Sequence, residues 1–254
     1  MKLGFIGTGT IASAMVEGLM KSNLPVEQIT ISPRNADRAA ELSKRFDKVK
    51  IGKDNQDVID QSDDVFICLR SQIAEEELKK LDFTKAKTVI SVIAMATASE
   101  TEKWIGKKVF RAVPLPFVAE AKGMTAIYPD NPELKKIFNA MGGAIAVKDE
   151  SQFALMMTVG SLMGVYFNLI ETANRWLEKN GLDESQSAPF LASMFGNLAD
   201  EARKANKPDF TALEAEYSTK KGTNELVSQY FTNHGGREAL TGGLDEAFKR
   251  IKDE

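Results

Sequence analysis

Cysteine and histidine are almost absent from the 254 residues, which contain one of each, Cys68 and His234. A single cysteine cannot form an intrachain disulfide, so a disulfide-stapled secreted fold is excluded. A zinc site built from clustered cysteine and histidine ligands is excluded as well, and no metal is expected. The formal net charge is −3 and the sequence pI is near 5.5, so the chain lacks the basic field that favours nucleic-acid binding.

Long apolar runs are also lacking. The opening residues Met1 to Ile6 lead directly into Gly7, whereas a signal peptide needs a longer apolar stretch and a cleavage site. No run approaches the roughly 20 apolar residues that span a bilayer, so no membrane partner is expected and a cytoplasmic protein is predicted. Hydrophobic residues make up 43% and charged residues 27%, which is enough for a core and too balanced for a disordered chain.

The first part of the chain alternates strand and helix signals. Short apolar runs of strand length lie at residues 3–6, 29–31, 65–69, 88–93, 109–113 and 124–128, and helical patterns lie at 11–20 and 36–46. Short, almost wholly apolar strands that alternate with helices favour a parallel sheet covered on both faces.

The pattern changes near Asp149, after which no convincing strand follows. Residues 153–177 read as one long helix that is apolar nearly all round, and helices at 184–204 and 237–252 come after it. A helix that is apolar all round is usually buried, and a subunit interface would bury it. We therefore predict two domains, a dinucleotide-binding domain at residues 1–148 and a helical domain at residues 149–254.

One motif carries chemistry. Gly7-Thr8-Gly9-Thr10-Ile11-Ala12 fits G-x-G-x-x-[GA], the dinucleotide fingerprint, between the first strand and the first helix. Gly7 allows the tight turn, Gly9 lets a pyrophosphate approach the backbone, and Ala12 keeps the helix close to the sheet. The helix N-terminus then offers unpaired N–H groups to the phosphates. The alternative is an ordinary strand–helix turn.

The end of the second strand indicates which nucleotide binds. Sites that prefer NAD(H) usually place a carboxylate there for the ribose 2′-hydroxyl, but this chain has Ser32-Pro33-Arg34-Asn35. The planar guanidinium of Arg34 can pair with a 2′-phosphate, so NADP(H) is the expected cofactor, with NAD(H) possible. The alternative for Arg34 is a solvated loop cation next to Asp37.

With these residues in view, the chain resembles the pyrroline-5-carboxylate reductase family along almost its whole length. The segments that resemble the family's motifs are Gly7–Ala12, Ser32–Asn35, Asn55, Leu69–Gln72, Ile90–Met95, Arg111–Pro116, Leu169–Ala173 and Gly235–Arg250. The resemblance implies an α/β fold, with a Rossmann-type doubly wound sheet followed by an all-α C-terminal dimerisation domain. It also implies hydride transfer from NADPH to a cyclic imino acid, and a homodimer or a higher homo-oligomer.

The resemblance extends to individual site residues. The implied cofactor contacts are Gly7, Thr8, Gly9, Thr10, Ile11, Ala12, Ser32, Arg34, Asn35, Asn55, Leu69, Arg70, Ala94 and Met95. Leu69 and Arg70 are expected over the adenosine side, and Ala94 and Met95 against the nicotinamide ribose. Thr223 is the candidate hydrogen-bond donor to the imine nitrogen. Glu171 is the candidate for orienting the nicotinamide end or ordering water, with a plain helix-face carboxylate as the alternative.

The departures from the family lie where its substrate specificity lies. A Gly-Ser-rich stretch is replaced by Thr158–Tyr166, an Asn by Leu115, and a Pro-Gly-Gly-Thr-Thr loop by Lys220-Lys221-Gly222-Thr223-Asn224. The resemblance implies that this loop binds the substrate carboxylate, so Lys221, Gly222, Thr223 and Asn224 are the expected contacts, at the N-terminus of a predicted helix. Ordinary N-capping with two solvated lysines is the alternative. A different imine, a carbonyl substrate or nucleotide binding without turnover therefore remain alternatives to reduction of pyrroline-5-carboxylate.

Overall fold

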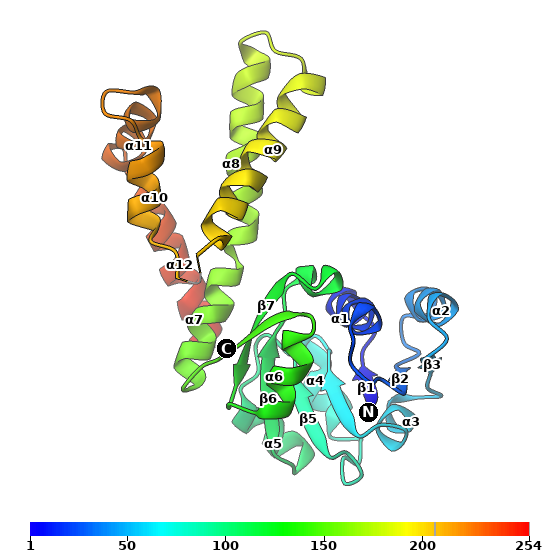
Figure 1. Cartoon of the computed structure of the whole chain (residues 1–254). Helices are drawn as coiled ribbons and strands as arrows, with labels where there is room; N and C mark the ends of the chain where they lie inside the picture. Colours follow the sequence, from blue (N-terminus) through cyan, green and yellow to red (C-terminus); the bar gives the residue numbers. More distant parts are fainter. Residues whose placement is uncertain (206, 254) are drawn as a thin grey trace. The chain divides into compact units, whose positions relative to one another are not determined.

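The computed structural model describes residues 1–205 and 207–253 (Figure 1). Contacts divide the chain into two compact units. The first unit comprises Met1–Met157 together with the residues from Arg250 onward, and the helical unit comprises Thr158–Lys249. This division falls inside a helix, whereas the predicted domain boundary at residue 148 precedes that helix. The predicted domain limits therefore stay a prediction.

The first unit is built on one eight-stranded sheet with the order β3-β2-β1-β4-β5-β6-β7-β8. The strands are β1 Lys2–Ile6, β2 Gln28–Ile31, β3 Val49–Ile51, β4 Asp64–Ile67, β5 Thr88–Ser91, β6 Val109–Val113, β7 Gly123–Tyr128 and β8 Gly142–Ala146. Neighbouring strands are parallel except β6 and β7, which pair antiparallel with Arg111 opposite Tyr128. The doubly wound Rossmann-type sheet is confirmed, and the antiparallel pair is a departure from the all-parallel expectation.

Helices cover both faces of the sheet, as Figure 1 shows. They are α1 Thr10–Lys21, α2 Ala36–Arg45, α3 Asn55–Asp60, α4 Ser71–Leu78, α5 Ala98–Ile105, the short 3₁₀ helix η1 Pro116–Glu120 and α6 Pro132–Asn139. Successive residues of a strand contribute to opposite faces, so Phe5 packs with α1 and α6 whereas Ile6 packs with α3 and α4. The rings of Phe5 and Phe66 stack with centroids 4.9 Å apart at the centre of the first of these cores.

The C-terminal part of the chain is helical throughout the described residues. Its helices are α7 Glu150–Gly160, α8 Leu162–Lys179, α9 Glu184–Arg203, α10 Phe210–Tyr217, α11 Thr223–Asn233 and α12 Gly236–Asp253. The single helix predicted at residues 153–177 is wrong, because the structure breaks it at Ser161. The Ser161 hydroxyl donates to the Thr158 carbonyl at 2.6 Å, and Gly160 and Gly164 flank the break. These contacts compete with regular helix bonds at this point.

The segment Glu150–Lys179, which contains α7 and α8, is long and apolar enough to cross a membrane by length and composition alone. Its most apolar 18-residue window has a mean hydropathy of 1.7, and 11% of that window is buried within the chain. No contiguous apolar run accounts for this value, because Thr158, Ser161 and Asn168 interrupt the segment. A single helix of this kind is weak evidence for a membrane span, since helices that are buried in soluble proteins have the same composition.

Candidate dinucleotide-binding site

The candidate site lies at the carboxyl edge of the sheet, where β1 has β2 on one side and β4 on the other. The strand order reverses at this point, because the chain first builds outward to β3 and then returns to continue at β4. Ligands of open α/β sheets bind in the crevice that such a reversal creates. The turn Gly7–Gly9 between β1 and α1 lies at this edge (Figure 1).

The two glycines of this turn have different roles. Gly7 has a φ of +96°, and a Cβ at this position would lie 2.7 Å from the Cys68 carbonyl oxygen, so both conformation and space require glycine. Gly9 has an ordinary φ of −89°, and a Cβ there would meet nothing within 4 Å. Gly9 is also the N-cap of α1, yet no side chain caps this helix and its first turn contains no acidic residue. The open space above uncapped N–H groups fits a pyrophosphate.

A chain of buried hydrogen bonds fixes the end of β2 beside this turn. The Thr8 hydroxyl donates to the Ser32 carbonyl at 2.6 Å, and the Ser32 hydroxyl donates to Asn55 Oδ1 at 2.8 Å. Asn55 is the first residue of α3, after the N-cap Asp54. The three predicted residues Thr8, Ser32 and Asn55 therefore lie together, and they join the ends of β1 and β2 to the start of α3.

Two arginines lie on the β2 side of the site. Arg34 is exposed, and its guanidinium lies 3.7 Å from the Glu77 carboxylate on α4. Arg38, in the first turn of α2, donates from Nη1 to the Thr10 hydroxyl at 2.9 Å and so reaches the start of α1. Sequence reasoning missed Arg38, although its position four residues after Arg34 places both cations near the start of the same helix. Asn35 is the N-cap of α2, and its side chain makes no capping bond.

Leu69 and Arg70 follow β4, as predicted. Leu69 is buried, and its Cδ2 would lie 3.2 Å from a Cβ on Gly7, so it packs beneath the glycine turn. Arg70 is exposed at the N-cap of α4. Both residues therefore border the same edge of the sheet as the glycine turn.

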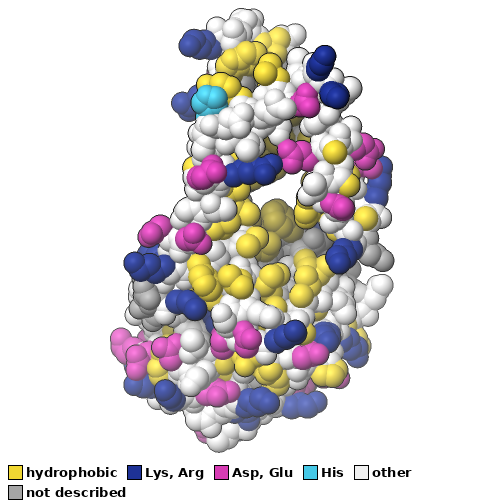
Figure 2. Space-filling view, turned by 90° about the vertical axis from the view of Figure 1, so that its left-hand side faces the viewer, with side chains coloured by type: hydrophobic (Ala, Val, Ile, Leu, Met, Phe, Trp, Pro, Cys, Tyr) yellow, Lys and Arg dark blue, Asp and Glu magenta, His cyan; other side chains and the backbone are white. Residues whose placement is uncertain are grey.

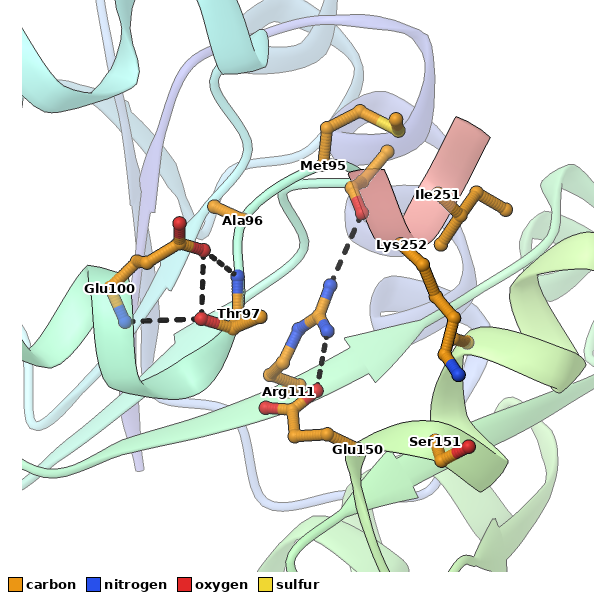
Figure 3. Close-up of a pocket in the computed structure, with 11 residues that line it drawn as sticks. Met95, Ala96, Thr97, Glu100, Arg111, Glu150, Ser151, Ile251 and Lys252 are labelled. Atoms are coloured by element: carbon orange, nitrogen blue, oxygen red, sulfur yellow. Dashed lines mark hydrogen bonds and ion pairs between the residues drawn. The ribbon is translucent and has the colours of Figure 1, made fainter. Parts of the chain in front are cut away.

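The turn after β5 is held by a buried arginine (Figure 3). Arg111 on β6 is 4% exposed, and its Nη2 donates to the carbonyls of Ile93 and Ala94, each at 3.2 Å. Its Nη1 pairs with Glu150 at 2.7 Å, and the Met95 N–H donates to the Ser71 hydroxyl at 3.2 Å. The predicted residues Ala94 and Met95 thus lie on a turn that has side-chain contacts to two other elements.

A cavity of about 340 Å³ lies beside this turn, lined by polar side chains that include Thr97, Glu100, Arg111 and Glu150. Burial lowers the pKa of Arg111, and the charge of Glu150 opposes that shift. The Arg111 guanidinium also packs over the Phe153 ring at 4.3 Å, whereas its Nε has no hydrogen-bond partner in the structure. Hydrogen bonds from the backbone and hydroxyl of Thr97 lower the pKa of Glu100. The two residues form a capping box at the start of α5.

The predicted catalytic and substrate residues lie in the helical unit. Glu171 on α8 is exposed and accepts from Arg175 Nε at 2.6 Å, a contact between neighbouring turns of one helix. Thr223 is the exposed first residue of α11, and Gly222 is its N-cap. Among the residues that the structure describes, no hydrogen bond or ion pair joins Glu171 to Thr223.

The first turn of α11 contains an unexpected carboxylate, Glu225. Lys221 has a φ of +59°, and its N–H donates to Glu225 Oε2 at 2.6 Å. Asn224 donates from its side chain to the Tyr217 carbonyl at 2.8 Å. The N-terminus that was expected to bind an anion therefore has an acidic side chain of its own. Sequence reasoning did not weigh Glu225, although its place in the first turn of the predicted helix was visible.

Metal-ligand clusters of three or more His, Cys, Asp or Glu side chains are not found anywhere in residues 1–205 and 207–253. The roles assigned to individual site residues stay predictions. What the structure adds is the grouping of the residues from Gly7 to Met95 along one sheet edge, with three further residues, Arg38, Arg111 and Glu150, beside them.

Comparisons with known proteins agree with this geometry. A family model described as NADP oxidoreductase, coenzyme F420-dependent, matches residues 2–95. A protein of Bacillus subtilis strain 168 named pyrroline-5-carboxylate reductase 2 is 26% identical over 262 residues, covering 98% of this chain and 93% of that protein. The structure of 1-pyrroline-5-carboxylate reductase from Streptococcus pyogenes has a TM-score of 0.85 at 21% identity, covering 100% of this chain and 99% of that one.

A pyrroline carboxylate reductase of Plasmodium falciparum, solved with NADP bound, has a TM-score of 0.83 at 17% identity and covers 100% of this chain and 97% of its own. The structural likenesses confirm the fold, and the sequence relatives extend over both units of the chain. The resemblance found in the sequence is thereby confirmed: along almost its whole length the chain is similar to proteins named pyrroline-5-carboxylate reductase.

Proposed function

We propose that the protein is an NADPH-dependent oxidoreductase that reduces the C=N bond of a cyclic imino acid, with 1-pyrroline-5-carboxylate converted to proline. The observation that carries the proposal is the uncapped start of α1 at Gly9, which has no acidic residue in its first turn and has two arginines beside it. The full-length relatives that bear the name of this activity support the substrate. A water-soluble, cytoplasmic enzyme is part of the proposal.

When bound, NADPH supplies a hydride to the imine carbon, and the imine nitrogen takes up one proton, giving the amine and NADP⁺. The N–H groups at the start of α1 hold the pyrophosphate, and Arg34 binds the 2′-phosphate. The turn at Ala94 and Met95 supports the nicotinamide ribose. Because a cyclic imine can be protonated in solution, the chain needs no strong acid. Its main contribution is to place the two reactants together, which is worth roughly 7–11 kcal/mol.

An assay of NADPH oxidation with pyrroline-5-carboxylate, run beside NADH, tests the proposal. Turnover with a clear preference for NADPH supports both the reaction and the nucleotide. NADPH binding without turnover on this imine would overturn the substrate assignment and leave a nucleotide-binding protein of the same fold.

One observation favours a second candidate, the reduction of another imine or of a carbonyl compound. The Glu225 carboxylate lies at the start of α11 and accepts from Lys221, where the resemblance implies that the substrate carboxylate binds. An acidic group there repels an anionic substrate unless Lys220 and Lys221 offset it. A higher kcat/KM for an uncharged cyclic imine such as 1-pyrroline than for pyrroline-5-carboxylate would select this candidate.

The hydroxyl of Thr223 is proposed to form a hydrogen bond with the substrate nitrogen, donating to the neutral imine and accepting from its protonated form. Replacing Thr223 with valine keeps the shape of the side chain and removes this donor, so we expect kcat to fall about 10-fold, or about 1.4 kcal/mol. Thr223→Ser keeps the hydroxyl and is expected to retain at least half of the activity. Steady-state kinetics of the two variants make the test, and equal rates for valine and wild type would remove Thr223 from the mechanism.

Assembly into a homodimer, or a higher homo-oligomer, through the helical unit is also proposed. Large apolar side chains lie exposed on α8, α9 and α11, including Phe167 at 66%. Figure 2 shows hydrophobic side chains (yellow) exposed at several places on one face of the molecule. Within the helical unit an apolar cavity of about 390 Å³ lies between α8 and α12. Monomers rarely leave so much apolar surface in water, and a second copy of the chain would cover it.

A charge on this apolar surface is expected to prevent assembly. Phe167→Asp would place a carboxylate where the interface is proposed, so we expect a monomer near 27.9 kDa by light scattering where wild type shows at least twice that mass. The control is Thr172→Asp, at an exposed position of α8 one turn after Asn168, and its mass should equal that of wild type. Wild-type protein that is monomeric at micromolar concentration would contradict the proposal.

A further inference from the structure

We infer that the ion pair between buried Arg111 and half-buried Glu150 is a positioning device for hydride transfer, acting through the turn from Ile93 to Ala98. The inference rests on the proposed function, because that proposal places Ala94 and Met95 beside the nicotinamide ribose. Neither Arg111 nor Glu150 is expected to touch the cofactor or the substrate. Their role is to fix the backbone that does.

Contacts from three separate elements hold the turn, and Figure 3 shows those that Arg111 makes. Arg111 from β6 donates to the carbonyls of Ile93 and Ala94, each at 3.2 Å. Glu150, the first residue of α7, accepts from the Ala98 N–H at 2.8 Å at the far end of the turn. Ser71, the first residue of α4, accepts from the Met95 N–H at 3.2 Å between them.

The pair joins the two ends of the turn because its members also bind each other. Arg111 Nη1 and Glu150 Oε2 are 2.7 Å apart, and the Arg111 side chain is almost fully buried over the Phe153 ring. A planar guanidinium offers its donors in a fixed fork, so it fixes the direction of each carbonyl that it contacts. A single ammonium or an apolar side chain cannot reproduce that geometry.

The direction of a carbonyl determines the direction of the next N–H. In a planar trans peptide the two point to opposite sides, so the bonds from Arg111 to the Ile93 and Ala94 carbonyls turn the N–H groups of Ala94 and Met95 away from Arg111. The Met95 N–H then meets Ser71. The pair therefore determines which backbone groups of the turn face the carboxyl edge of the sheet.

A stability role alone does not explain the choice of charged residues. Removing the Arg111 charge from water costs several kcal/mol, and a well-packed apolar side chain is often at least as stabilising as a buried charge with its partner. What the pair supplies beyond stability is a single orientation of the turn. Misplacement of a bound reactant by about 1 Å can cost about 100-fold in rate.

Three variants test the inference. Glu150→Gln keeps the size of the side chain but removes the charge that pairs with Arg111. Ser71→Ala removes the hydrogen bond from Met95 to α4 without disturbing a buried charge. It therefore tests the same turn if Glu150→Gln does not fold. Glu17→Gln is the matched control, because it makes the same chemical change to a partly exposed glutamate whose partner, Arg45, is exposed rather than buried.

The measurement is the single-turnover rate of hydride transfer, expressed per bound NADPH. We expect this rate to fall roughly 30- to 100-fold in Glu150→Gln and about 5-fold in Ser71→Ala, with the Kd for NADPH changed less than the rate. Glu17→Gln should match wild type. A merely structural pair would lower the amount of binding-competent protein and leave the rate per bound NADPH unchanged, and that result would overturn the inference.

Failure of the proposed function would look different. Wild-type protein would then show no hydride transfer to any cyclic imine tested, whatever the state of the turn. Transfer in wild type that stays unchanged in both Glu150→Gln and Ser71→Ala leaves the proposed function standing and overturns only the positioning role.

Discussion

Replacing Gly9 with aspartate is expected to leave the folded protein as stable as wild type, or slightly more stable, while raising the Kd for NADPH about 1000-fold. A Cβ on Gly9 meets nothing within 4 Å, and its φ of −89° suits any residue. Aspartate is a better N-cap than glycine by a few tenths of a kcal/mol and suits the positive end of the α1 dipole. The same carboxylate would stand where the pyrophosphate binds and repel it, a loss of about 4 kcal/mol in binding.

Gly7→Ala is the matched comparison, because it changes the other glycine of the same turn. It should lower the stability of the fold and leave the Kd of the folded protein for NADPH near that of wild type. Its positive φ and the carbonyl oxygen 2.7 Å from the added Cβ predict a loss of about 3 kcal/mol in the free energy of unfolding. Urea unfolding and titration of NADPH fluorescence measure both quantities for both variants. NADPH binding by Gly9→Asp at wild-type affinity would show that the cofactor does not use the start of α1.

The contrast between these glycines shows what the sequence could predict. The motif at residues 7–12 placed the turn and the start of α1 correctly, because each residue of the fingerprint has a local steric role. The buried strands were equally predictable: β6 was expected at residues 109–113 and has those bounds. Strands that are covered on both faces are short, fully apolar runs, and such runs are visible without knowledge of their neighbours.

The strands that the sequence did not predict lie at the two ends of the sheet. β3 has only three residues, Val49–Ile51, and two of them are exposed. β8 opens with Gly142 and Gly143, which lack the side chains that produce a strand pattern. An edge strand pairs on one side only and buries less, so its apolar signal is weak.

The break between α7 and α8 could not be predicted from periodicity. Apolar residues continue across Ser161 in helical spacing, and only the back-bond from its hydroxyl to Thr158 shows where the helix ends. The contacts of Arg111 could not be predicted from the sequence for a similar reason. Its partner Glu150 is 39 residues away, and the fold alone brings the two together. Interactions of that range depend on the sheet order rather than on a local pattern.

Charge reversal at Arg34 is expected to invert the nucleotide preference. Arg34→Asp would remove the proposed partner of the 2′-phosphate and supply a carboxylate for a ribose 2′-hydroxyl, so we expect kcat/KM to fall about 1000-fold with NADPH and to rise with NADH. The fold should tolerate the change, because Arg34 is exposed and its ion pair with Glu77 at 3.7 Å contributes at most about 1 kcal/mol. Steady-state kinetics with NADPH and with NADH, at the same ionic strength, measure the two kcat/KM values.

Alanine variants then separate the roles of the two arginines on the β2 side of the site. Arg34→Ala should weaken NADPH and leave NADH unchanged, since only one of the two nucleotides carries the 2′-phosphate. Arg38 donates to Thr10 at the start of α1, so Arg38→Ala should weaken both nucleotides if its guanidinium acts at the pyrophosphate, and NADPH alone if it shares the 2′-phosphate. Arg45→Ala, in the exposed pair with Glu17, is the control. Equal losses for NADPH and NADH in Arg34→Ala would contradict the 2′-phosphate assignment, because a residue that reads that phosphate cannot affect a nucleotide that lacks it.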